Sequence, residues 1–336
     1  LGLRDAGWHV TGDDLDQGTL ALALELEVLD ATGLDPDAEI TFVATPVGAV
    51  AASVQRALAQ THGIVTDVGS VKAPIAAAID DPRFVAGHPM AGSEHSGVRG
   101  ARADLFHGAV WVLTPDAHAD DTNYARIRSV VSSLGADVVT VDPVAHDELV
   151  AVVSHVPHLT AVTLMALADE RSVEHRALLR LAAGGFRDMT RIAAGDPGIW
   201  PDICTENAPA ITGVLDQLIT SLSAIRTQVA DHDQLALLRT LERARAARVN
   251  LPTGVPSDVA LAEVRVPVAD KPGELAAITR LATDIDVNIY DIEIAHSAEG
   301  PGGVVILIVP EARAERLVGA LMAHQYRPSM RPLESP

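Results

Sequence analysis

Cysteine, aromatic side chains and positive charge are all scarce in this chain of 336 residues. Cys204 is the only cysteine, which excludes an internal disulfide bond and a metal site built from cysteines alone. Aromatic residues make up 3% of the chain, too few for the stacking surfaces that bind single-stranded nucleic acid. The 45 acidic residues outnumber the 25 basic ones, and the resulting net charge of -20 repels nucleic acid and anionic membranes. We therefore expect neither as a partner.

Long apolar runs are also lacking. No uninterrupted run approaches the ~18 residues needed to cross a bilayer. The first ten residues, LGLRDAGWHV, have neither the charged nor the apolar region of a signal peptide. These absences predict a cytoplasmic protein. Hydrophobic residues in total are abundant, at 48%, and at this length they can form the cores of two or three domains.

The hydrophobic pattern changes along the chain and divides it into three predicted domains. Residues 1–147 alternate β-branched runs with helical stretches, which predicts a doubly wound, Rossmann-like α/β domain with a parallel sheet. Residues 148–249 repeat apolar side chains at helical spacing only, so we expect an all-helical domain. Residues 250–258 (NLPTGVPSD) have the composition of a linker. Residues 259–330 show a βαββα order, which is the ferredoxin-like arrangement.

The same patterns place the individual elements. In the first domain we expect strands at 8–11, 40–44, 64–67, 84–86, 109–113 and 137–141, and helices at 47–59, 71–78 and 123–134. In the second we expect helices at 148–167, 173–181, 206–228 and 232–247. In the third we expect strands at 261–268, 287–295 and 304–309, and helices at 274–284 and 312–324.

An acidic residue, Asp14, follows the first expected strand. In a dinucleotide-binding fold such an acid accepts hydrogen bonds from the adenosine ribose and repels a 2′-phosphate, which favours NAD over NADP. An aspartate in an ordinary surface turn is the alternative. The Gly-rich loop that binds the pyrophosphate is not found, because residue 1 already falls inside the expected first helix. We expect the first strand and this loop to lie upstream or to have been lost.

Unusual polar residues concentrate in a few short segments. These are DVGSVK at 67–72, GHPMAGSEHSG at 87–97, SHVPH at 154–158 and GGFRDMTRIAAGDPGIW at 184–200. The first two follow expected strands, where doubly wound folds bind their ligands. Together the segments resemble the prephenate and arogenate dehydrogenases, from residue 1 to about residue 230. The resemblance implies NAD-dependent oxidative decarboxylation of prephenate in tyrosine biosynthesis, and a homodimer formed through the helical domain.

The resemblance assigns chemical roles to His88 and Ser70. It implies that His88 bonds the ring hydroxyl of the substrate and accepts its proton while hydride leaves the same carbon, which suits an imidazole that titrates near neutral pH. Ser70 would bond the same hydroxyl, or the histidine, beside the nicotinamide. A core histidine and a serine N-cap of the helix at 71–78 are the alternatives. Thr45 and Pro46 resemble the turn beneath NAD, although proline also suits a helix start.

Substrate contacts are implied for a second set of residues. Arg191 would hold a substrate carboxylate with two parallel hydrogen bonds, oriented by Asp188, although a purely structural pair of these two residues is the alternative. The other implied substrate residues are Ser154, His158, Glu94 and Trp200, of which the tryptophan also suits simple packing between helices. His155 and His158 with His146 suggest a zinc site, but no cysteine or third ligand at helical spacing supports it, so we expect no metal.

The C-terminal segment at 264–289 resembles the ACT domains, which bind amino acids and regulate metabolic enzymes. The free amides at the start of a helix can receive a carboxylate. The effector contacts that the resemblance implies are Pro272, Gly273, Glu274, Leu275 and Asn288. Tyrosine, the end product of the pathway, is the expected effector, and a purely structural dimerising domain is the alternative.

Several functions stay open on the sequence alone. Arogenate differs from prephenate only in a side-chain amino group in place of a keto group. A non-catalytic amino-acid sensor would explain the missing Gly-rich loop. Another hydride-transfer enzyme with a helical dimerisation domain is disfavoured by the GHPMAG segment at 87–92, and a zinc enzyme using His155 and His158 would be inactivated by a chelator.

Overall fold

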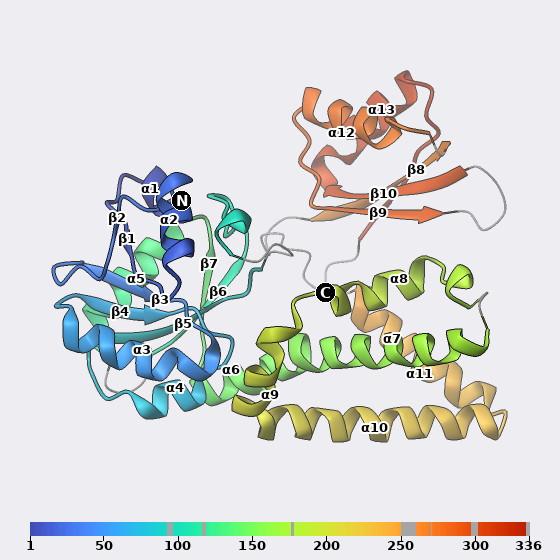
Figure 1. Cartoon of the computed structure of the whole chain (residues 1–336). Coiled ribbons are helices and arrows are strands. Elements are labelled where there is room, and N and C mark those ends of the chain that lie inside the picture. Colours follow the sequence, from blue (N-terminus) through green and yellow to red (C-terminus); the bar gives the residue numbers. More distant parts are fainter. Residues whose placement is uncertain are drawn as a thin grey trace. The chain divides into compact units, whose positions relative to one another are not determined.

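The computed structural model describes residues 1–92, 97–115, 119–175, 178–249, 260–269, 271–296 and 302–333 (Figure 1). The chain forms two compact units, Leu1–Ala224 and Ile225–Pro336.

A five-stranded sheet with the order β3-β4-β5-β6-β7 forms the centre of the first unit. The strands are β3 (Ile40–Val43), β4 (Ile64–Asp67), β5 (Phe84–Pro89), β6 (Val110–Thr114) and β7 (Asp137–Thr140). Neighbouring strands are parallel except for β5 and β6, which are antiparallel. The prediction of an all-parallel sheet is therefore wrong at this pair. Parallel neighbours need a crossover helix, and between β5 and β6 the described residues contain only the 3-10 turn Val98–Gly100.

Helices cover both faces of this sheet, as the sequence predicts. They are α3 (Val47–Gln60), α4 (Ala73–Ala78) and α5 (Asp121–Ser133). Because side chains alternate along a strand, Phe84 and Ala86 of β5 pack with α3 and α4, whereas Val85 packs with α5. The last residues of β4 and β5 thereby end up at one edge of the sheet, between helices that hold them in place.

A small two-stranded parallel sheet precedes the main one along the chain. Its elements are α1 (Gly2–Asp5), β1 (Thr11–Gly12), α2 (Gln17–Glu25) and β2 (Ala31–Thr32). The strand expected at 8–11 is displaced, since β1 begins at Thr11. Both α2 and β2 were not predicted, because the exposed α2 has only two buried side chains, Leu20 and Ala23, to mark its inner face.

The helical part of the first unit begins immediately after β7. Its longer helices are α6 (Pro143–Val150), α7 (Val156–Glu174), α9 (Trp200–Glu206) and α10 (Ala208–Ala230), the last of which continues into the second unit at Ile225. Its shorter elements are Leu178–Leu181, α8 (Gly184–Thr190), Arg191–Ala194 and Pro197–Ile199. A π-helical turn, Ala151–His155, joins α6 to α7 without a break. The helix expected at 173–181 is wrong: α7 ends at Glu174, and Leu178–Leu181 is a 3-10 turn. The apolar residues that suggested this helix, Val173 and Leu181, are 82% and 79% exposed, so burial does not stabilise it.

Helix α10 packs beside the start of α7 through Ala151, Val156 and Ile211. By length and composition alone, two helical segments, Pro143–Val173 and Ala208–Ala230, are apolar enough to cross a membrane. This differs from the expectation drawn from uninterrupted apolar runs, since both segments contain charged residues such as Asp169 and Asp216.

The second unit contains α11 (Gln234–Val249) and an antiparallel sheet with the order β11-β8-β10-β9. The elements of this part are β8 (Leu261–Ala269), α12 (Glu274–Asp284), β9 (Asp291–His296), β10 (Gly302–Pro310), α13 (Glu311–Ala323) and β11 (Ser329–Pro332). The helices α12 and α13 pack on the sheet through Ile278 and Leu317, against Val264 and Leu307. The predicted strand start at 287 is wrong: pairing with β10 begins at Asp291, so Asn288 lies before the strand, not inside it.

Candidate active site

Buried polar side chains gather where β4 and β5 end. Asp67, the last residue of β4, accepts hydrogen bonds from the backbone N–H of Gly69 at 2.9 Å and of Gly87 at 3.1 Å, and forms an ion pair with Lys72. All of these groups are shielded from solvent, Asp67 and Lys72 completely. A Cβ at Gly87 would lie 3.0 Å from the Asp67 carbonyl oxygen, so this close approach favours glycine. Asp67 thus fixes β5 one residue before His88.

His88 begins a chain of buried hydrogen bonds. Its Nδ1 lies 2.9 Å from Nε2 of His146, and Nδ1 of His146 lies 2.7 Å from Oδ1 of Asp147. The Asp147 carboxylate also accepts from the backbone N–H of Lys72 and of Ala73, each at 2.8 Å. Asp147, on α6, therefore accepts the hydrogen bonds of the amides at the start of α4, although it lies 75 residues after Lys72 in the sequence.

Asn207, at the junction of α9 and α10, connects this chain to a second group of histidines. Its side-chain N–H donates to the Asp147 carbonyl at 2.9 Å, and the same nitrogen lies 3.2 Å from Nδ1 of His155. His158 stacks on Trp200 with ring centroids 3.6 Å apart, and His155 meets the same indole edge-on at 6.2 Å. The π-helical turn and the start of α7 supply both histidines.

Burial keeps these histidines neutral. Desolvation lowers the pKa of His88 well below its usual value of 6.5, and the neighbouring His146, Lys72 and His155 act in the same direction. Desolvation lowers the pKa of His155 to about 4, and that of His158 is lowered for the same reason. Burial also lowers the pKa of Lys72, although Asp67 opposes the shift. A neutral imidazole at His88 is able to accept a proton.

Ser70 lies after β4 and is not the N-cap residue of α4, which was the alternative to its proposed role. Helix α4 begins at Ala73 and its N-cap residue is Lys72, with no side-chain cap of its own. The two oxygens of Asp147 take that function instead. Ser70 is only half-buried, and it lies between the buried residues Gly69 and Val71.

The predicted substrate residues lie around α7. Ser154 is half-buried in the π-helical turn, beside His155. Arg191 is the first residue of the turn Arg191–Ala194, which packs against α7, and both it and Asp188 on α8 are exposed. Glu94 lies outside the described residues.

The predicted cofactor residues occupy the ends of strands. Asp14 follows β1, is exposed, and accepts a hydrogen bond from the backbone N–H of Asp16 at 2.8 Å. Thr45 and Pro46 follow β3, where Pro46 is the N-cap residue of α3 and the Thr45 hydroxyl lies 3.3 Å from that of Ser53. Strand ends are where doubly wound folds bind a dinucleotide, and the contacts of these three residues stay predictions. A Gly-rich loop for the pyrophosphate is not present among residues 1–336.

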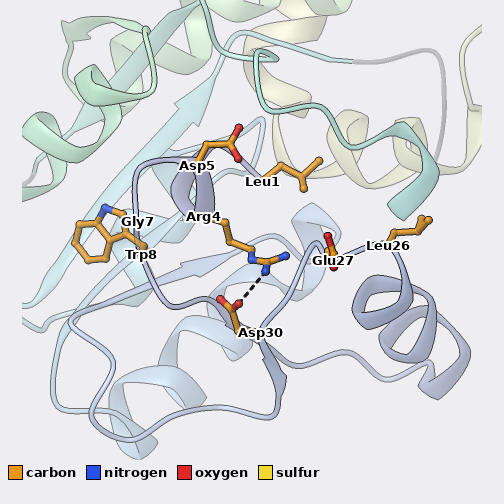
Figure 2. A pocket seen from close by; sticks show the side chains of 8 residues that line it. All are labelled: Leu1, Arg4, Asp5, Gly7, Trp8, Leu26, Glu27 and Asp30. Carbon is orange, nitrogen blue, oxygen red and sulfur yellow. Dashed lines mark ion pairs between the residues drawn. The ribbon is translucent and has the colours of Figure 1, made fainter.

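One further feature of the first unit lies apart from this site. A surface depression of about 450 Å³ contains the ion pair Arg4–Asp30 at 3.0 Å, and none of the residues discussed above lines it (Figure 2). Within the described ranges, no group of three or more His, Cys, Asp or Glu side chains is arranged to hold a metal ion.

Comparison with known proteins identifies the family to which this chain belongs. The nucleotide-binding domain model of prephenate dehydrogenase matches residues 1–140, and the dimerization domain model of the same enzyme matches residues 142–243. A prephenate dehydrogenase of Bacillus subtilis is 31% identical over 89% of this chain and 84% of its own length. The chain belongs to the prephenate dehydrogenase family.

Further proteins are similar to this chain in sequence or in structure. A cyclohexadienyl dehydrogenase of Zymomonas mobilis is 36% identical over 65% of this chain and 76% of its own. The crystal structure of prephenate dehydrogenase from Aquifex aeolicus, in complex with hydroxyphenyl propionate and NAD+, covers 75% of this chain and 92% of its own, with 27% identity and a TM-score of 0.70. Synechocystis arogenate dehydrogenase covers 74% and 92%, with 29% identity and a TM-score of 0.64.

Sequence reasoning missed several residues that surround His88 in this family member. Lys72, Asp147 and Asn207 were not singled out, and His146 was considered only as a metal ligand. One signal was available: His146 and Asp147 are adjacent at the start of a helix that directly follows β7. Their link to His88, 58 residues away, appears only in the folded chain.

Proposed function

We propose that this protein is an NAD-dependent prephenate dehydrogenase that converts prephenate into 4-hydroxyphenylpyruvate and carbon dioxide in tyrosine biosynthesis. The observation that carries the proposal is the buried, neutral His88 at the end of β5, in a chain that belongs to this family. The ligand of the Aquifex aeolicus relative supports it, since hydroxyphenyl propionate is, like the expected product, a phenol with a carboxylate side chain.

His88 supplies the acid–base chemistry in this proposal. It takes the proton of the C4 hydroxyl while the C4–H electron pair leaves as hydride, so that a carbonyl forms at C4. The bond from the ring to its carboxylate then breaks, carbon dioxide departs, and the electron pair enters the ring. His88 returns the proton to the oxygen, which gives the phenol. When bound, NAD accepts the hydride.

Binding of NAD is assigned to residues at the strand ends. Asp14 accepts hydrogen bonds from the adenosine ribose, and Thr45 and Pro46 support the dinucleotide at the start of α3. Ser70, after β4, bonds the substrate hydroxyl or His88 on the nicotinamide side. The remaining substrate contacts come from the helices around α7.

Those helices hold the two carboxylates and the ring of the substrate. Arg191 grips a carboxylate with two parallel hydrogen bonds, and Asp188 orients it. Ser154, His158 and Trp200 line the site, supported by the stacking of His158 on Trp200. Glu94 is assigned to the entrance of the cleft.

A three-domain division accompanies this function: a NAD-binding domain at 1–147, a helical domain at 148–249, a linker at 250–258 and an ACT domain at 259–330. The ACT assignment is supported by the element order of a ferredoxin-like fold and the strand order β11-β8-β10-β9. Tyrosine is the proposed effector.

Tyrosine would bind where α12 begins. Gly273 has a left-handed backbone (φ +96°) that turns the chain into α12, and Glu274 accepts a hydrogen bond from the hydroxyl of Tyr326 at 2.9 Å. The remaining proposed contacts are Pro272, Leu275 and Asn288, the last from the segment before β9.

The proposed assembly is a cytoplasmic homodimer, without nucleic acid or membrane as a partner. Helix α10 supports it, because Ile219 and Leu222 are 59% and 53% exposed in a segment that matches a dimerization domain. A second copy of the chain would cover these side chains.

An assay with the protein expressed from its natural start codon tests the function. The protein is supplied with NAD and either prephenate or arogenate, and reduced nicotinamide is followed with and without tyrosine. We expect turnover of prephenate and inhibition by tyrosine. Turnover of arogenate alone would establish the alternative substrate, which the Synechocystis relative favours. No turnover of either, together with tyrosine binding, would replace the enzyme by an amino-acid sensor.

A further inference from the structure

We propose that His146 and Asp147 are positioning residues that hold His88 in one tautomer, with its proton on Nδ1 and a free lone pair on Nε2. The inference rests on the proposed role of His88 as a base. It adds two residues to the reaction that neither touch the substrate nor belong to the segments that identified the family.

The direction of the hydrogen bonds follows from Asp147. An ionised carboxylate only accepts hydrogen bonds. The N–H groups of Lys72 and Ala73 each donate to one of its oxygens at 2.8 Å, so both oxygens act as acceptors. The contact of 2.7 Å between Oδ1 of Asp147 and Nδ1 of His146 therefore requires the proton on Nδ1 of His146.

That proton fixes the next step of the chain. A neutral imidazole with a proton on Nδ1 has only a lone pair on Nε2, so Nε2 of His146 must accept. Its partner at 2.9 Å is Nδ1 of His88, which must then carry the proton and donate it. His88 is left with its lone pair on Nε2, the nitrogen that can take a proton from a substrate.

Burial strengthens the preference of His88 for the tautomer with its proton on Nδ1. His88 and His146 are 8% and 1% exposed, so water cannot replace the bond between them. The opposite tautomer of His88 would place two lone pairs against each other at 2.9 Å in a dry environment.

The same chain responds to the charge that develops during the reaction. When Nε2 of His88 takes a proton, the ring becomes positive, and the negative charge of Asp147 reaches it through His146. The other groups facing His88 are Lys72 and His155, which disfavour a positive ring. Lys72 is itself neutralised by Asp67. The His146 ring also disfavours a positive His88, so the favourable contribution to the protonated base comes from Asp147, which ends the chain of hydrogen bonds.

The tautomer can be measured directly without substrate. Two-bond 1H–15N correlation spectra of the full-length protein with labelled histidine, at about pH 8, show which ring nitrogen carries the proton, since every histidine with an ordinary pKa of about 6.5 is neutral there. The His88 signals are identified by their loss in His88→Asn. We expect a pyrrole-type Nδ1 and a pyridine-type Nε2. A proton on Nε2 of His88 would overturn the proposal.

Variants supply the kinetic test. His146→Leu removes the nitrogen that accepts the hydrogen bond from His88. Asp147→Asn replaces a group that only accepts by one that can also donate, so the direction of the hydrogen bonds is no longer fixed. We expect each variant to lower kcat by roughly 10²–10⁴-fold with a KM for substrate close to that of the wild type. His146→Gln retains an acceptor oxygen and should recover at least about tenfold of the loss caused by His146→Leu.

A matched control separates positioning from general damage. Thr61→Val removes the bond from another buried side chain, the Thr61 hydroxyl, to the Ala57 carbonyl at 2.9 Å, on the far end of α3. It should lose thermal stability as the site variants do, but keep kcat. Equal kcat in His146→Leu and Thr61→Val would refute the positioning role. Because the spectra need no substrate, failure of the dehydrogenase assay and failure of the tautomer assignment are distinguishable.

Discussion

At the scale of single residues, the site is distinguished by histidines that are buried and therefore neutral. His88, His155 and His158 are each less than 9% exposed, and burial lowers the pKa of each. Desolvation penalises a charged ring, so burial provides bases that stay unprotonated at physiological pH. The same burial makes the fold sensitive to acid.

Replacing His88 tests its proposed chemistry. We expect His88→Asn to bind NAD as the wild type does and to lower kcat by about 10²–10⁴-fold, the usual contribution of a general base. In the wild type, kcat/KM should stay level as the pH falls through 6.5, because the pKa of His88 is lowered and protonation inactivates the base only at more acidic pH. An acid limb at or above pH 6.5 would contradict this.

Replacing Arg191 tests the proposed carboxylate contact. Arg191→Ala should raise the KM for prephenate by roughly 10–100-fold and change kcat little, since hydrogen bonds to a charged group contribute about 1.5–3 kcal/mol. Arg187→Ala removes an equally exposed arginine four residues earlier and serves as the control. If both variants have the wild-type KM, Arg191 has only a structural role.

His155 links stability to pH. Its pKa is about 4 in the folded chain because of burial, against an ordinary value of 6.5. Above pH 6.5 the ring is neutral in both the folded and the unfolded state. Between pH 6.5 and about 4 the unfolded chain binds more protons, so this stability is lost as the pH falls, by roughly 2–3 kcal/mol in total.

The urea midpoint of the wild type and of His155→Gln, followed from about pH 7 to about pH 4, measures that loss. His88 and His158 act in the same direction in both proteins, so the difference between the two curves isolates His155. The variant should lose stability less steeply. Parallel curves would show that His155 is not the source.

At the scale of elements, the π-helical turn Ala151–His155 determines which residues meet. It contains one residue more than an α-helical turn and lies between His146 and Asp147 on α6 and His158 on α7. Removing that residue would rotate the two helices relative to each other by about 100°. Both histidine groups then could not face the site together.

Deletion of Val152, which is 55% exposed, tests this arrangement. We expect helix content by circular dichroism to be retained and kcat to fall by more than about 10²-fold, since a base that is displaced or turned loses its contribution. Val152→Ala keeps the length of the turn and should retain its activity. A deletion variant with wild-type kcat would show that the turn does not set the geometry.

The elements also show which parts of the fold can be predicted from the sequence alone. Strands with a buried β-branched run, such as β3 and β4, and helices with a core face, such as α3, were predicted to within a residue or two. The antiparallel pair β5–β6 and the end of α7 were not: α7 continues to Glu174, beyond the predicted end at 167, because strand direction and helix ends depend on tertiary partners. In the site, His88 and Trp200 follow from motifs, whereas the link from His88 to Asp147 depends on packing.

At the scale of the whole molecule, the apolar face of α10 predicts assembly. Leu215 and Leu218 pack beside α7, and the exposed Ile219 and Leu222 continue along the helix. We expect the wild type to be a dimer in light scattering and the double variant Ile219→Glu and Leu222→Glu to be a monomer. Gln217→Glu, on the opposite side of α10, should leave the dimer intact. A wild-type monomer would contradict the proposed interface.

Asp147 restricts how this enzyme can move. Its carboxylate joins α6 to the first turn of α4, and its neighbour His146 contacts His88 on the sheet. A hinge that swung α6 away from the sheet would break both amide bonds and release His88 from its orientation in the same motion. Opening at this point would separate the proposed base from its partners, so the chemical step would require α6 to be docked.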